Sequence, residues 1–82
     1  MPEFIDILLE TETEVCNRIA DLCNDREQLD ASYLTAFGQC VELGDFLRLA
    51  EERNERLAAI DREIIVRSNA LRKLKAQIEV AS

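Results

Sequence analysis

The sequence contains no histidine and no tryptophan, and it has only one proline and two glycines among its 82 residues. Without imidazole, zinc sites, haem sites and histidine-based mechanisms lose their commonest ligand or base. Gly38 and Gly44 stand alone, which excludes a glycine-rich phosphate loop. We therefore expect no metal ion, no cofactor and no enzymatic activity.

The three cysteines, Cys16, Cys23 and Cys40, are an odd number and lack CxxC spacing. If Cys16 and Cys23 share a helix, their backbones lie about 10 Å apart, too far for a disulfide. A reactive thiol needs positive charge close by, and Arg18 falls on a different helix face from Cys16. We expect all three to be small, buried apolar residues.

Long apolar runs are also missing. None approaches the roughly 18–20 residues that a membrane-spanning helix requires. Glu3, Asp6 and Glu10 interrupt the first apolar residues, and no basic segment precedes them, so the N-terminus does not resemble a signal peptide. These features predict a cytoplasmic protein that does not bind membranes.

Apolar residues make up 48% of the chain and charged residues 33%, with much Leu, Ala, Glu and Arg. This composition predicts an all-α protein and is close to that of coiled coils. The length fits one domain, 1–82. A chain this short buries only about 60–65% of its unfolded surface, so its stability is marginal and association with another chain is the usual remedy.

The first half reads as two amphipathic helices. Apolar residues at alternating three- and four-residue steps predict a helix over about 3–26, which Pro2 would open, although Glu12 and Arg26 interrupt its apolar stripe. The polar segment 24–30 predicts a chain reversal. A second helix follows over about 31–43 and ends near Gly44. A helix continuous through Gly44 fits nearly as well, because one glycine costs only about 1 kcal/mol.

The last forty residues carry the strongest signal, a heptad pattern that predicts a long helix over about 45–80. One core position is occupied by Leu43, Ala50, Leu57, Ile64, Leu71 and Ile78, and the other includes Phe46, Ile60, Leu74 and Ala81. A helix of about 35 residues is roughly 50 Å long, more than a globular domain of this size covers. Part of the stripe is therefore expected to face another chain.

Arg53 and Arg67 fall on the same core line. In one interpretation their stems lie along the seam while the guanidinium groups reach carboxylates such as Glu63. In the other they meet acids of another helix and set the register and the partner. A parallel homodimer would stack each arginine on its own copy, so antiparallel or heterologous pairing is favoured.

The net charge of −7 is unevenly distributed, since residues 1–45 carry eleven acids and two bases, and residues 46–82 six acids and eight bases. A row of acids on the first helix could imitate nucleic-acid phosphates. These acids are Glu3, Asp6, Glu10, Glu14, Asp21 and Asp25. No aromatic residue lies among the few clustered bases near the C-terminus, so we expect no direct nucleic-acid binding.

The sequence thus predicts an antiparallel helical hairpin or a three-helix arrangement with a long C-terminal coiled-coil helix, most simply as a homodimer. The expected internal core is Ile5, Leu8, Val15, Ile19, Leu22, Phe37, Val41 and Phe46. The expected contacts to another chain are Arg53, Leu57, Ile60, Ile64, Arg67, Leu71, Leu74 and Ile78. The expected function is a small acidic adaptor or inhibitor that binds a larger protein through apolar helix faces. The alternative is an acidic nucleic-acid mimic that blocks a DNA- or RNA-binding protein.

Overall fold

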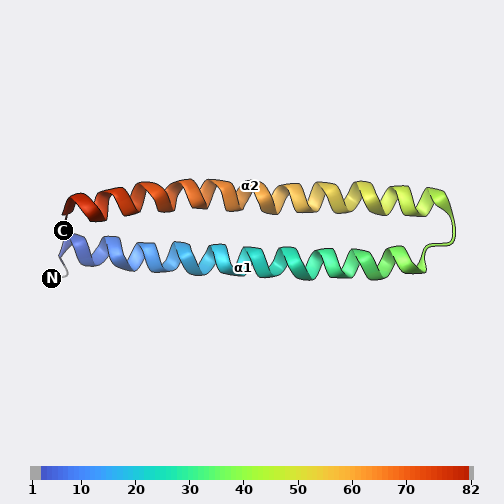
Figure 1. Ribbon diagram of the computed structural model, residues 1–82, viewed down its shortest axis with the longest axis horizontal. Helices are drawn as coiled ribbons and strands as arrows, with labels where there is room; N and C mark the ends of the chain where they lie inside the picture. The colour runs from blue at the N-terminus through green and yellow to red at the C-terminus, as the bar shows by residue number, and fades with distance from the viewer. Residues whose placement is uncertain (1–2, 82) are drawn as a thin grey trace.

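The computed structural model describes residues 3–81, which form a hairpin of two long helices. Helix α1 (Phe4–Gln39) and helix α2 (Leu43–Ala81) lie side by side in opposite directions (Figure 1). The predicted all-α class and the helical hairpin are confirmed. A third helix is not present among these residues, so the three-helix alternative is wrong.

Helix α1 begins where the Glu3 carbonyl accepts hydrogen bonds from the backbone N–H groups of Asp6 and Ile7, at 3.0 and 3.2 Å. Asp6 lies in the first turn, where a carboxylate opposes the positive end of the helix dipole. Pro2, which the sequence places at the helix start, lies outside the described residues. The opening predicted near residue 3 thus matches the structure at its first described turn.

The chain reversal predicted at 24–30 is wrong, because α1 runs through this segment without a break. The segment contains neither glycine nor proline, so nothing in it stops a helix. Two of its polar side chains have partners on α2: Arg26 bonds Asp61, and Asp30 bonds Arg53. The polarity of this segment therefore comes from exposed helix positions and from two contacts between the helices, and it does not mark a turn.

The chain reverses at residues 40–42. Cys40 is extended (φ −72°, ψ 133°) and its N–H donates to the Phe37 carbonyl at 3.2 Å, which closes the last turn of α1. Helix α2 then starts with a bond from the Phe46 N–H to the Glu42 carbonyl. Gly44 lies inside the first turn of α2, so neither a break at Gly44 nor one helix continuous from α1 describes the connection.

The apolar stripe of α2 faces α1 of the same chain. Leu57, in the middle of the stripe, is only 6% exposed, and α1 is the one described element that can cover it. Helix α1 is 36 residues long, nearly matching the 39 of α2, so it extends along almost the whole stripe. The continuous α1 supplies the cover that two shorter helices would not.

The predicted core is confirmed at its centre and wrong at its end. Leu8 and Leu22 are buried, whereas Val41 is 96% exposed in the connection. Phe46 remains 42% exposed, although its ring lies 4.9 Å from that of Phe37. The other predicted core residues are half-buried: Ile5, Val15, Ile19 and Phe37. The core fails at this end because α1 stops at residue 39 and leaves the start of α2 uncovered.

The cysteines are less buried than predicted. Cys16 and Cys23 are exposed, and Cys40 is half-buried. Cys16 and Cys23 directly follow the seam residues Val15 and Leu22, so each is turned about 100° away from the seam. They border the contact between the helices without entering it.

The hairpin is extended, with principal extents of 61 × 16 × 15 Å. Its radius of gyration is 18.5 Å, against about 12 Å for a compact domain of this length. The accessible surface is 6206 Å², against about 5,000 Å² for a compact monomer of this mass. None of the described helices has the length and the apolar character needed to cross a membrane.

Candidate interaction surfaces

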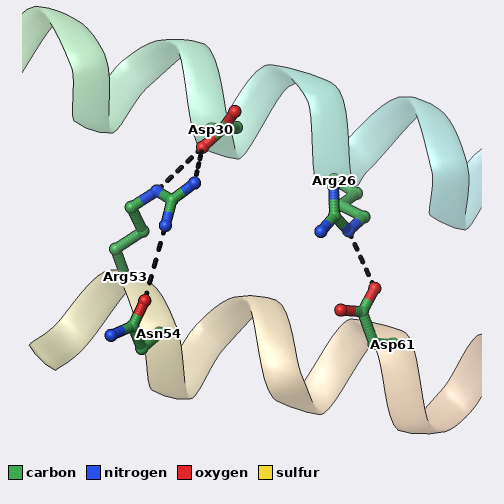
Figure 2. A network of polar contacts seen from close by, with 5 residues as sticks. All are labelled: Arg26, Asp30, Arg53, Asn54 and Asp61. Atoms are coloured by element: carbon green, nitrogen blue, oxygen red, sulfur yellow. Dashed lines mark hydrogen bonds and ion pairs between the residues drawn. The ribbon is translucent and has the colours of Figure 1, made fainter. Parts of the chain in front are cut away.

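Two ion pairs join the helices near the middle of the hairpin (Figure 2). Arg53 of α2 donates through Nε and Nη2 to the Asp30 Oδ1 of α1, at 2.8 and 2.5 Å. Arg26 of α1 donates through Nε to Oδ1 of Asp61, at 2.8 Å. This bond and the neighbouring negative charge raise the pKa of the Arg26 guanidinium, against a smaller opposing effect of burial. Arg53 therefore does meet an acid of another helix, but that helix is α1 of its own chain.

Arg67 behaves as in the interpretation in which the guanidinium group reaches a carboxylate such as Glu63. Its Nε and Nη2 donate to Oε1 of Glu63 on the same helix, at 3.1 and 3.0 Å, and Arg18 of α1 donates to the same oxygen at 3.3 Å. The hydrogen bond from Arg67 and, secondarily, the pairing with Arg18 lower the pKa of the Glu63 carboxyl, although partial burial opposes them. Of the two core-line arginines, Arg53 therefore joins α2 to α1, whereas Arg67 bonds within α2.

Tyr33 is a buried aromatic residue that the predicted core omits. Its ring centroid lies 6.3 Å from that of Phe37, and the Arg56 guanidinium carbon lies 5.9 Å from it, within cation–π range. Burial, and then a hydrogen bond with Glu52, raise the pKa of the Tyr33 hydroxyl, while Arg56 opposes this. The eleven-residue step from Leu22 to Tyr33, three helical turns, is the signal that places it in the seam.

The structure places the predicted contact residues along the side of α2 that faces α1. Leu57 is buried and the others are half-buried: Arg53, Ile60, Ile64, Arg67, Leu71, Leu74 and Ile78. They are brought together as one stripe, which α1 covers. Their role as contacts to another chain stays a prediction.

The predicted acidic residues are all exposed, and no ion pair within residues 3–81 involves any of them. Five lie on α1: Asp6, Glu10, Glu14, Asp21 and Asp25. Glu3 immediately precedes the helix. Their negative charge is therefore directed to solvent and not neutralised within the chain.

The end of the hairpin at the connection carries exposed apolar side chains. Val41, Leu43 and Phe46 are 96%, 72% and 42% exposed. We call these three residues the apolar tip. Leu43 and Phe46 belong to the heptad stripe of α2, but they lie beside the end of α1, which cannot cover them fully.

At the opposite end, a shallow hollow of about 450 Å³ is lined by Phe4, Ala76, Gln77, Val80 and Ala81. None of these side chains titrates, so the hollow offers no acid, base or nucleophile. Within residues 3–81, no group of three or more potential metal ligands lies close enough to hold an ion.

In comparisons with known proteins, no family model matches the chain, and no curated protein or solved structure does so either.

Proposed function

We propose that this chain is a non-catalytic protein-interaction module, a small helical adaptor or inhibitor that binds a larger protein through exposed apolar helix residues. The observation that carries the proposal is the apolar tip. A protein surface seldom leaves three large apolar side chains exposed together at one end unless something binds there.

The seam supports this choice of surface. The heptad stripe is already covered by α1, so a partner would have to separate the two helices in order to use Leu57 or its neighbours. The tip needs no such opening. A groove or a flat apolar patch on a larger protein can accept the end of a rigid helical hairpin at little entropic cost.

Quantitative affinity capture from source-cell extract tests the proposal. The wild-type chain and the Leu43→Asp variant serve as baits. A specific partner should be retained by the wild-type chain and depleted at least about tenfold by the variant, since a buried charge costs more than 1.4 kcal/mol.

The matched control is Val80→Asp, because Val80 is 87% exposed at the opposite end of the hairpin. The partner should remain bound to this variant. A capture profile that is identical for wild type and Leu43→Asp would show that the tip binds nothing.

A second candidate is the acidic nucleic-acid mimic, supported by the six exposed, unpaired carboxylates described above. Such a chain would bind a DNA- or RNA-binding protein mainly through charge, so its affinity should fall steeply from low to high salt. Binding through the apolar tip should change little over the same range. A salt titration of the captured complex therefore separates the two functions.

A further inference from the structure

The apolar stripes of the two helices share one seven-residue phase. Residues seven apart from Leu8 to Ile78 are all apolar, and the series runs through the connection without a break. Its members are Leu8, Val15, Leu22, Leu29 and Ala36 of α1, then Leu43, Ala50, Leu57, Ile64, Leu71 and Ile78 of α2. Every member is buried or half-buried in the hairpin except Leu43, which is 72% exposed.

A hairpin does not need this agreement in phase. Its connection turns the chain back, so α1 and α2 can each present a stripe to the other whatever the number of residues between them. In one continuous helix, two stripes fall on the same side only if they are whole heptads apart. Ala36 and Leu43 are one heptad apart, so a helix continuous through 40–42 would carry a single unbroken stripe.

The connection lacks the residues that usually end a helix. Cys40, Val41 and Glu42 include neither glycine nor proline, and no residue of 3–81 has the positive φ of a glycine C-cap. Cys40 has a φ of −72°, which already suits a helix, and only its ψ of 133° departs from helical geometry. The chain can therefore straighten here by changing backbone torsions in residues 40–42 alone.

The contacts between the helices are centred on the connection. Phe37 and Phe46, whose rings are 4.9 Å apart, lie at nearly equal distances along the chain before and after it. The same is true of Asp30 and Arg53 (Figure 2). Two straightened chains that lie antiparallel, with their connections side by side, would therefore form each of these contacts between copies.

We infer that two copies of this chain straighten at the connection and pair as antiparallel continuous helices, in a dimer that exchanges α2. The seam between α1 and α2 then forms twice, each time between copies. Leu43 of each copy lies within about one turn of the twofold axis, so the two Leu43 side chains cover each other. Such an exchange is a low-cost route to a dimer, because every contact of the seam is kept.

This dimer would control access to the apolar tip. The closed hairpin exposes Leu43, whereas the dimer covers it, so a second copy and a foreign partner would compete for this residue. The inference goes beyond the proposed function, because the dimer forms from the chain alone and needs no foreign protein.

The first test is the molar mass of the reduced protein by light scattering, after refolding from urea at several concentrations so that the helices can exchange. Wild type should approach twice the chain mass of 9.4 kDa as the concentration rises, whereas Val41→Pro should stay at 9.4 kDa.

Proline at residue 41 suits the hairpin. Cys40 before it is already extended, and the Val41 N–H donates to no backbone group of residues 3–81. In the dimer the same proline would interrupt a continuous helix in each copy. Dimerisation should therefore weaken by at least about ten-thousandfold.

Val41→Ala is the matched control. Val41 is 96% exposed in the hairpin, and in a continuous helix it lies two residues before Leu43, on the side away from the stripe. The alanine variant should therefore dimerise like wild type. A wild-type monomer at all concentrations, or equal masses for Val41→Pro and Val41→Ala, would overturn the inference.

The same proline variant keeps the dimer and the proposed function distinguishable. Val41→Pro retains Leu43 and Phe46, so it can still capture a foreign partner when it no longer dimerises. Loss of the dimer with capture retained would support both proposals, and a dimer that captures nothing would remove only the proposed function.

The second test measures a distance within one chain, because an exchanged dimer has the same outline as two closed hairpins that meet tip to tip. Spin labels are attached at the exposed positions Gln28→Cys and Glu55→Cys. The background carries Cys16→Ala, Cys23→Ala and Cys40→Ala, which should stay dimeric because alanine favours helix. Labelled chains are refolded with an excess of the unlabelled cysteine-free chain, so that each dimer contains at most one labelled copy.

The two arrangements give different distances in the dimer fraction. In a closed hairpin Gln28 and Glu55 lie at nearly the same level of neighbouring helices, within about 20 Å. In a straightened chain they lie on one helix about 40 Å apart. A distance near 40 Å is expected, and a distance confined to about 20 Å would overturn the exchange of α2.

Discussion

At the scale of single residues, the pairs between helices explain how α1 and α2 find one register. The apolar stripe repeats every seven residues, so sliding one helix by seven would still set leucine and isoleucine against apolar positions. The pairs Arg53–Asp30 and Arg26–Asp61 do not repeat in this way. A slip would leave these charges unpaired. The polar residues therefore determine the register of the two helices, which the apolar stripe alone does not.

Arg53→Ala should lower the free energy of unfolding by about 1 kcal/mol, because Arg53 and Asp30 are each about one-third exposed. Arg53→Lys should recover only part of this, since lysine keeps the charge but loses the guanidinium fork. A double-mutant cycle with Asp30→Ala, measured by urea unfolding, should give a coupling energy of about 0.5–1 kcal/mol.

Arg62→Ala is the control for this cycle, because Arg62 is exposed and takes part in no ion pair among residues 3–81. Its effect should stay within about 0.5 kcal/mol. If the Arg53 and Asp30 substitutions prove strictly additive, the pair does not stabilise the fold.

Tyr33 should ionise above its ordinary pKa of 10.0, because burial and the hydrogen bond with Glu52 favour the neutral phenol in the folded chain. It is the only tyrosine and there is no tryptophan, so tyrosinate absorbance reports on this one side chain. Because the pKa of Tyr33 is raised in the folded chain, the contribution of Tyr33 to stability is fully present below about pH 10. It is lost as the pH rises through the pKa of the folded chain.

Parallel alkaline titrations of wild type and Tyr33→Phe, followed by circular dichroism, isolate this contribution from the titration of lysines. The loss of helix above pH 10 should be steeper for wild type. An absorbance midpoint at or below 10.0 would contradict the buried position of the ring.

At the scale of the helices, the two glycines are dispensable. Gly38 and Gly44 lie inside α1 and α2, neither has positive φ, and a Cβ built on either meets no atom within 4 Å. Gly38→Ala and Gly44→Ala should each raise the free energy of unfolding by about 0.5 kcal/mol, less than the full helix-interior gain because both are near helix ends. Thermal unfolding of the single and double variants measures this. A destabilised variant would mean that the connection needs glycine.

Much of the hairpin could be predicted from the sequence, because helix type and the seam follow from the spacing of apolar residues. Leu8, Leu22 and Leu57 lie in the seam, as that spacing indicates. The reversal could not be placed, since 24–30 is strongly polar and 40–42 is not. Polar residues occur both in turns and between packed helices, and only the partner on the other helix distinguishes the two.

The interaction surfaces were harder to predict for a related reason. A heptad stripe has the same sequence whether it packs within a chain or between chains. Whether α1 is long enough to cover the stripe depends on its length. The predicted length was too short because the turn was placed at 24–30.

At the scale of the whole molecule, the surface through which two chains associate would determine the shape of the particle. Two hairpins that pack along their lengths would lie side by side, so the particle would become thicker but hardly longer than 61 Å. Two hairpins that met through their apolar tips would instead form a rod of nearly double length. Dimer mass alone does not separate these outcomes, whereas the radius of gyration does.

Small-angle X-ray scattering should therefore give a radius of gyration near 19 Å for a side-by-side dimer, since displacing two 18.5 Å hairpins by about 10 Å adds little. Tip-to-tip association should give about 36 Å, because the two centres would then be about one hairpin length apart. The larger radius in wild type would assign self-association to the tip and remove the tip as a free site for a foreign partner.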